Sequence, residues 1–336
     1  MTVPPTPCRA RSRALPRVLA AALAACAIVC PTAWPIAWPG LAGVCEAKTA
    51  ISLEGPMLVL DSPNEAKLPR NFRATGDAVR KAAANGPSLD GLAELHASAS
   101  GQFSEAELRF MLARLPKDTV LVDLRQESHG FVSSVAVSWY GERNRANAGK
   151  TQAEIAEDEK NRLREVEAGA NVGVGILKWG EKERETAPES IVVPVKKVFS
   201  EAELAPFYGL GYRRIPAPDA LGPRDEDVDA FLELARSLPR GAWAHFHDNS
   251  GLGRATTYLV MYDIWRNAQA ASLEDIVKRQ LLLGGTDLAS EGHAGRRVQE
   301  FKDREAFFRR FYEFSKESHG DRQPSWAGFT AKHSGK

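Results

Sequence analysis

Apolar and polar residues alternate along this chain with two periodicities, one typical of β-strands and the other of α-helices. Short apolar or alternating runs predict strands at residues 57–60, 119–124, 191–198 and 242–246. Amphipathic repeats predict helices at residues 105–114, 151–168, 225–238, 255–267 and 297–317. Strands that alternate with helices in this way indicate an α/β domain.

Local signals at the helix ends support these boundaries. Ser104 and Ser200 each stand three residues before a Glu, which is the spacing of a capping box. Ser272 begins a further predicted helix, and Gly284 with Gly285 ends it. The last predicted helix carries a stripe of aromatic residues, which we expect to pack in the core: Phe301, Phe307, Phe308, Phe311, Tyr312 and Phe314.

The first 47 residues differ from the rest of the chain. Four arginines precede an apolar run at residues 18–30, and small residues follow up to Ala47. This order is typical of a secretory signal peptide, and the apolar run is short for a membrane span. We therefore expect cleavage near Ala47, no transmembrane segment in the mature chain, and a periplasmic or secreted protein. Residues 23–26 also resemble a lipoprotein signal with Cys26 as the lipidated residue, which is the alternative.

Cysteine usage and net charge exclude several classes of function. All four cysteines lie in the predicted leader, at positions 8, 26, 30 and 45, so the chain after residue 47 has no disulfide, thiolate metal site or cysteine nucleophile. The 44 basic residues nearly balance the 43 acidic ones, which gives no electrostatic case for nucleic acid. No metal-binding motif is present, and we expect neither a metal nor a cofactor.

Residues 243–257 carry the most distinctive pattern, an apolar strand, a loop with two glycines and a helical stretch. A strand that delivers a loop into a helix N-terminus makes an anion site, because free N–H groups and the helix dipole converge there. Gly251 and Gly253 let successive amides face inward, and Arg254 offers a bidentate grip on phosphate oxygens. Taken alone, the same pattern also describes an ordinary strand-to-helix connection with a surface Arg.

Several further blocks resemble one known family in their order and spacing. They are residues 68–73 (LPRNFR), 123–131 (DLRQESHGF), 137–150 (VSWYGERNRANAGK), 215–219 (IPAPD) and 243–247 (WAHFH). Together they resemble the bacterial protein-tyrosine-phosphatase-like phytases, also called cysteine phytases, over nearly the whole chain after the leader. The resemblance implies an α/β cysteine-phosphatase core, a mixed sheet flanked by helices, with a small inserted partial β-barrel in one domain over residues 48–336.

The resemblance also implies roles for individual residues. Residues 247–254 correspond to the family's phosphate loop, in which Arg254 grips phosphate and His247 orients the backbone. Asp219 corresponds to the general acid, and Asp248 stands where the family has its nucleophilic cysteine. The other residues expected to contact phosphate are Asn249, Ser250, Gly251, Leu252, Gly253, Arg73, Lys197 and Arg125. The partner implied is a phosphorylated small molecule such as an inositol polyphosphate.

Two departures from the family pattern lie in this loop. Asp248 replaces the nucleophilic cysteine, and Ala255 replaces a hydroxyl residue that in the family hydrogen-bonds the thiolate. A carboxylate resembles the anion that the loop binds, so Asp248 is expected to fold into the amides and pair with Arg254 as an internal phosphate mimic. A phosphate beside it would meet like-charge repulsion of roughly 4 kcal/mol at about 4 Å.

Three hypotheses about function remain open. The first is a catalytically impaired relative that binds a phosphorylated ligand. The second is an active phosphomonoester hydrolase on inositol polyphosphates or phosphoprotein, with Asp248 as nucleophile or activator of water and Asp219 as acid. The third is a self-blocked pocket on a protein-interaction scaffold. Among the other polar residues, we interpret His245 as structural, His129 as a turn residue and residues 139–141 as a packed turn.

Overall fold

The structure of the protein is a computed structural model that describes residues 55–80, 86–141, 144–177, 189–239, 241–288, 297–318 and 325–333. The predicted leader, with Ala47 and Cys26, lies outside these residues. Every described residue belongs to a single compact unit. No helix in the described ranges combines the length and apolar character that a membrane crossing requires.

A five-stranded sheet carries the loop of interest. Its order is β10-β4-β11-β3-β2, with β10 Gly211–Arg214, β4 Val120–Asp123, β11 Ala244–Asp248, β3 Ala97–Gly101 and β2 Arg73–Ala74. The first four strands are parallel, and β2 pairs antiparallel with β3 at the edge. β11 therefore lies between two parallel neighbours and is buried along its whole length.

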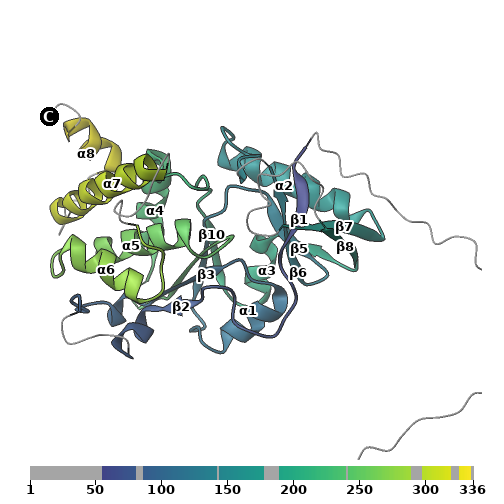
Figure 1. The fold of residues 1–336 in the computed structure, drawn as a ribbon, viewed down its shortest axis with the longest axis horizontal. Helices are drawn as coiled ribbons and strands as arrows, with labels where there is room; N and C mark the ends of the chain where they lie inside the picture. Colours follow the sequence, from purple (N-terminus) through teal and green to yellow (C-terminus); the bar gives the residue numbers. More distant parts are fainter. Residues whose placement is uncertain are drawn as a thin grey trace, which may run out of the picture. The chain divides into compact units, whose positions relative to one another are not determined.

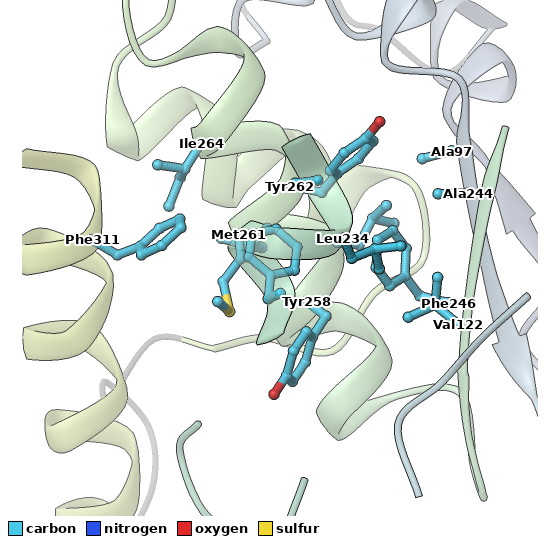
Figure 2. Close-up of a cluster of buried hydrophobic side chains, with 14 of the residues drawn as sticks. Ala97, Val122, Leu234, Ala244, Phe246, Tyr258, Met261, Tyr262, Ile264 and Phe311 are labelled. Carbon is cyan, nitrogen blue, oxygen red and sulfur yellow. The ribbon is translucent and has the colours of Figure 1, made fainter. Parts of the chain in front are cut away.

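Most of the helices pack on one face of this sheet (Figure 1). They are α4 Asp225–Ser237, α5 Gly253–Asn267, α6 Leu273–Leu282, α7 Arg297–Glu317 and α8 Trp326–His333. Side chains alternate along β11, so Ala244 and Phe246 face these helices, where they join Tyr258, Met261 and other core residues (Figure 2). His245 and His247 face the opposite side of the sheet.

That opposite side packs against α1 Glu105–Leu112, α3 Glu201–Phe207 and part of a second sheet. The second sheet has six strands in the order β8-β7-β1-β6-β5-β9. They are β1 Met57–Ser62, β5 His129–Val132, β6 Val135–Tyr140, β7 Asn171–Ile176, β8 Glu189–Pro194 and β9 Val198–Phe199, and α2 Gln152–Glu167 covers them. β8 and β9 are the edge strands, and no pairing that closes this sheet into a barrel is recorded among the described strands.

The mixed α/β fold predicted from the sequence is confirmed, and so are most of its helices. α1 and α3 begin with the expected capping boxes at Ser104 and Ser200, and the aromatic stripe of α7 lies largely in the core. Short 3₁₀ helices at Thr75–Arg80 and Ala93–Leu95 complete the described elements.

Three predictions about strands are corrected by the structure. Residues 191–198 belong to two strands, because β8 ends at Pro194 and pairs with β7, whereas β9 begins at Val198 and pairs with β5. Trp139 belongs to β6, where it pairs with Leu58 of β1, and the expected turn at residues 139–141 is wrong. β11 continues past Phe246 to Asp248, which places two polar side chains at its end.

Candidate anion-binding site

The candidate site is the loop between β11 and α5, at the carboxyl ends of the parallel strands. β11 ends at Asp248 and α5 begins at Gly253. The backbone of β4 and the segment after β3 hold the loop at its base, since Leu124 donates its N–H to the His247 carbonyl at 3.0 Å and Gln102 donates to the Asn249 carbonyl at 3.1 Å. Amides at the start of α5 and its dipole therefore point into one small region.

Gly251 is required by the path of this loop. Its φ is +80°, and a Cβ built at this position would lie 2.3 Å from the Gly101 nitrogen and 2.4 Å from the Ser100 carbonyl carbon. Both the conformation and the close approach exclude a side chain. At Gly253, by contrast, a Cβ would meet nothing within 4 Å.

Asp248 accepts hydrogen bonds from three loop amides. Its Oδ1 receives the N–H groups of Ser250 at 2.7 Å and Gly251 at 2.5 Å, and its Oδ2 receives the Ala255 N–H at 2.9 Å. The Ser250 hydroxyl adds a longer bond of 3.2 Å to Oδ1. The carboxylate, which is only 2% exposed, thus occupies part of the amide nest, as predicted for an internal anion.

Other donors of the loop remain open to a ligand. The N–H of Leu252 is taken by the Ser250 hydroxyl at 3.2 Å. The N–H groups of Gly253 and Arg254, in the first turn of α5, have no hydrogen-bond partner recorded within the described ranges. Two helix-terminal amides and the positive end of the helix dipole are therefore available for an anion.

Arg254 pairs with Glu127, not with Asp248 as expected from the sequence. Its two terminal nitrogens bind the two Glu127 oxygens at 2.8 and 2.9 Å, a bidentate arrangement. Burial raises the pKa of Glu127, but Arg254 and Arg125 outweigh it and hold the pKa well below its usual range. The Nε of Arg254 is buried and makes no hydrogen bond among the described groups, although a carboxylate oxygen of Asp219 lies 3.7 Å away.

The three basic residues expected to contact phosphate outside the loop hold different positions. Arg125 is fully buried and binds Asp61, Gln102 and Glu127. Arg73 is also buried and supports the loop from beneath, since it donates to the Gly251 carbonyl at 2.7 Å and the Thr256 hydroxyl at 3.0 Å. Burial lowers the pKa of Arg73 to about 10, and the Asp248 carboxylate opposes this shift.

Lys197 contacts Glu105 and Phe199 and not the loop between β11 and α5. Its Nζ lies 3.5 Å from a Glu105 oxygen and 4.8 Å from the centre of the Phe199 ring. The structure therefore records no direct contact between the loop and Lys197, and its expected role in phosphate binding stays a prediction.

Asp219 lies beside the loop Arg. One of its oxygens is 3.7 Å from the Arg254 Nε and also accepts the Ala220 N–H at 3.0 Å. The other oxygen accepts from the Asn144 side-chain amide at 3.0 Å. The carboxyl group is partly exposed, at 37%, so it can reach both solvent and a ligand in the loop.

The three histidines behind the loop are buried. His245 is structural, as expected, because its two ring nitrogens contact the hydroxyls of Ser98 at 2.8 Å and Ser100 at 3.0 Å. Burial and the neighbouring His247 hold the pKa of His245 well below its usual range. His247 has a close polar contact with Glu201 at 2.6 Å.

His129 is the first residue of β5 and not a turn residue, so that interpretation is wrong. Its ring lies among Asp123 at 3.3 Å, Glu159 at 3.4 Å and Glu201 at 3.6 Å. Burial lowers the pKa of His129, but Asp123 above all outweighs this effect and raises the pKa to about 10. A charged imidazole therefore lies between the two sheets.

Sequence reasoning missed several residues that shape the site. Glu127 and Glu201 are buried carboxylates that contact Arg254 and His247, and Asn144 contacts Asp219. Glu127 and Asn144 fall inside the resembling blocks, but their types and spacing alone carry no signal for these contacts. Within the described ranges, no group of three or more His, Cys, Asp or Glu side chains is arranged to hold a metal ion.

The fold and the loop together define the class of protein. A parallel sheet whose central strand leads into a glycine-containing loop, an Arg and a helix N-terminus is a phosphatase-type α/β fold, with a candidate anion site at the carboxyl ends of the strands.

Comparisons with known proteins agree with this class. A family model for PTP-like phytases, described by the words inositol hexakisphosphate, matches residues 122–266. The PTP-like myo-inositol phosphatase of Mitsuokella multacida, solved with myo-inositol-(1,3,4,5)-tetrakisphosphate, is 33% identical with a TM-score of 0.74, covering 82% of this chain and 49% of that one. A PTP-like phytase from Bdellovibrio bacteriovorus is 29% identical with a TM-score of 0.63, covering 82% of this chain and 95% of that one.

Among curated proteins, effector protein hopD2 of Pseudomonas syringae pv. tomato is 27% identical over 270 residues, which cover 78% of this chain and 56% of that protein. The chain thus spans about half the length of this relative and of the Mitsuokella phosphatase. The family model and the structural neighbours thus show similarity to the PTP-like phytases in sequence and in fold.

Proposed function

We propose that this protein binds a phosphorylated ligand, such as an inositol polyphosphate, at residues 247–254 and that its phosphatase chemistry is impaired. The observation that carries the proposal is the position of Asp248, whose two oxygens accept three amide N–H groups. A carboxylate held in this way has its lone pairs turned toward the loop, which opposes attack on phosphorus. No cysteine occurs after residue 47, so no thiol can act as the nucleophile in place of Asp248.

Ligand binding is supported by the donors that Asp248 leaves open. They are the amides of Gly253 and Arg254 and the Nε of Arg254. All three favour a dianion, and the bidentate bond to Glu127 holds the guanidinium in place. The Mitsuokella relative, crystallised with an inositol tetrakisphosphate, supports an inositol polyphosphate as the class of ligand.

A second candidate function is residual hydrolysis, and Asp219 is the observation that favours it. Its carboxyl group is partly exposed and lies 3.7 Å from the Arg254 Nε, within reach of the leaving oxygen of a bound phosphate ester. A protein that only binds its ligand does not require an acid there. In this mechanism Asp248 or a water that it activates attacks phosphorus and Asp219 protonates the leaving group.

Phosphate release from phytate by the purified protein separates these functions, with Asp248→Cys and Asp248→Ala measured beside it. We expect no release from the parent and from Asp248→Ala, and release from Asp248→Cys, whose thiolate matches the loop. Release from the parent that disappears in Asp248→Ala would establish hydrolysis instead. If the parent binds neither inorganic phosphate nor phytate and Asp248→Ala binds them, the pocket is self-blocked and the scaffold hypothesis takes its place.

We also propose that residues 1–47 are a signal peptide and that residues 48–336 form one phosphatase domain, with the six-stranded sheet as its inserted β element. The protein would then work in the periplasm or outside the cell. Mass spectrometry of the mature N-terminus tests this, since cleavage near Ala47 supports export and a lipid on Cys26 supports the lipoprotein alternative.

A further inference from the structure

A buried carboxylate lies behind the phosphate loop, where a ligand does not reach. Glu201 is the first residue of α3 and is 1% exposed. The capping box of α3 is made by Ser200 and Glu203, so the end of the helix does not need the Glu201 side chain. It turns into the interior instead, toward the end of β11.

Glu201 contacts the end of β11, which leads into the loop, and the segment after β3, which holds its base. One oxygen lies 2.6 Å from the Nε2 of His247, the residue before Asp248, at an angle that departs from an aligned hydrogen bond. The other oxygen accepts from the Gln102 side-chain amide at 3.1 Å. Gln102 in turn donates its backbone N–H to the Asn249 carbonyl at 3.1 Å. A single carboxylate therefore supports the loop on both sides of Asp248.

The charge of Glu201 is unusual for a side chain without access to solvent. Burial raises its pKa, but His247 and His129 outweigh this and lower the pKa to about 2, against a smaller opposing effect of Asp123. Buried charges carry a desolvation cost, and apolar residues of similar volume often give equal or greater stability. A buried carboxylate in this position is thus better explained by the geometry that it imposes than by the stability that it adds.

We propose that Glu201 is a positioning residue for the phosphate loop, which it orients through His247 and Gln102. Its other neighbour, His129 at 3.6 Å, belongs to β5 of the six-stranded sheet. Glu201 thereby connects the position of that sheet to the loop. The effect on ligand affinity rests on the proposed function, whereas the effect on the loop backbone does not.

Glu201→Gln tests this proposal, because it keeps the size of the side chain and removes its charge. Glu203→Gln is the matched control on the same helix, since the Glu203 carboxylate is recorded only with Ser200. Two readouts are measured on the mature chain: amide hydrogen exchange of residues 249–255 and the affinity for inorganic phosphate. We expect exchange about tenfold faster and affinity about tenfold weaker in Glu201→Gln, the size of one lost charged hydrogen bond, with Glu203→Gln unchanged.

Unchanged loop exchange in Glu201→Gln, with only the midpoint of global unfolding lowered, would overturn the proposal and leave Glu201 a structural residue. If Glu201→Gln does not fold, Glu201→Asp is measured instead. This substitution keeps the charge but shortens the side chain by one methylene, and we again expect faster exchange of the loop amides. A parent protein that does not bind phosphate contradicts the proposed function alone, because the exchange comparison still decides the role of Glu201.

Discussion

The carboxylate of Asp248 and the backbone N–H of Ala255 form a 2.9 Å hydrogen bond that joins the end of β11 to the first turn of α5. This bond closes the loop on itself, with Asp248 where an external anion would otherwise draw on the same amides. Under the proposed function, the loop is a phosphate site in which Asp248 already uses three of the amide donors.

Asp248→Asn should bind inorganic phosphate at least about tenfold more tightly than the parent. The substitution removes a like charge whose repulsion is roughly 4 kcal/mol at about 4 Å in a medium of effective dielectric near 20, and even partial relief of it exceeds a factor of ten. Isothermal titration calorimetry at constant salt measures the change. Asp229→Asn, on the exposed side of α4, controls for net charge, and equal affinities in all three proteins would contradict the prediction.

Replacement of each loop glycine by alanine should change the free energy of unfolding to very different extents. Gly251→Ala places a Cβ within 2.3 Å of backbone at a φ of +80°, so we expect a loss of roughly 3 kcal/mol or more of unfolding free energy and loss of phosphate binding. Gly253→Ala has open space and lies in the first turn of α5, so stability should stay within about 1 kcal/mol of the parent. Urea unfolding of both variants checks this contrast, and a loss in Gly251→Ala as small as that expected for Gly253→Ala would contradict it.

Glu127→Ala should strongly destabilise the protein. It leaves the buried guanidinium of Arg254 without its bidentate partner, and breaking a buried pair of this kind costs about 3–5 kcal/mol. The exposed pair of Arg224 and Glu226 at 2.9 Å provides the comparison, since Glu226→Ala should cost under about 1 kcal/mol. Chemical denaturation measures both, and a small loss in Glu127→Ala would mean that Arg254 finds another acceptor.

Stability should fall as pH rises from neutral toward 10 because of His129. Its pKa is raised to about 10 in the folded protein against about 6.5 unfolded, so the charged imidazole contributes fully below about pH 6.5 and its contribution is lost by pH 10. The slope between these limits approaches about 1.4 kcal/mol per pH unit.

The groups that face this imidazole are Asp123, Glu159, Glu201, Arg125 and Arg214. Urea unfolding at several pH values, with His129→Asn as the control, separates its contribution from theirs. His129→Asn should be less stable at pH 6 and should show a flatter profile up to pH 10. An unchanged slope in that variant would assign the alkaline loss to other groups.

Much of the fold follows from local features of the sequence. The helices opened by Ser104 and Ser200 and the strand at β4 appear where capping residues and β-branched runs predict them. Local signals succeed here because cap bonds and apolar periodicity act within one or two turns of chain. β3 was missed, since its residues, Ala97–Gly101, are small and polar and take their strand conformation from pairing with β11.

The sequence by itself determined that two glycines and an Arg follow a predicted buried strand, that Asp248 stands just after that strand, and that no cysteine occurs after residue 45. Only the tertiary structure decided the partners of these groups. Arg254 pairs with Glu127, which lies 127 positions earlier in the chain, and not with Asp248. Glu201, at the start of α3, contacts His247. Such pairings depend on which strands and helices meet at one end of the sheet, and no local pattern of residue types encodes that meeting.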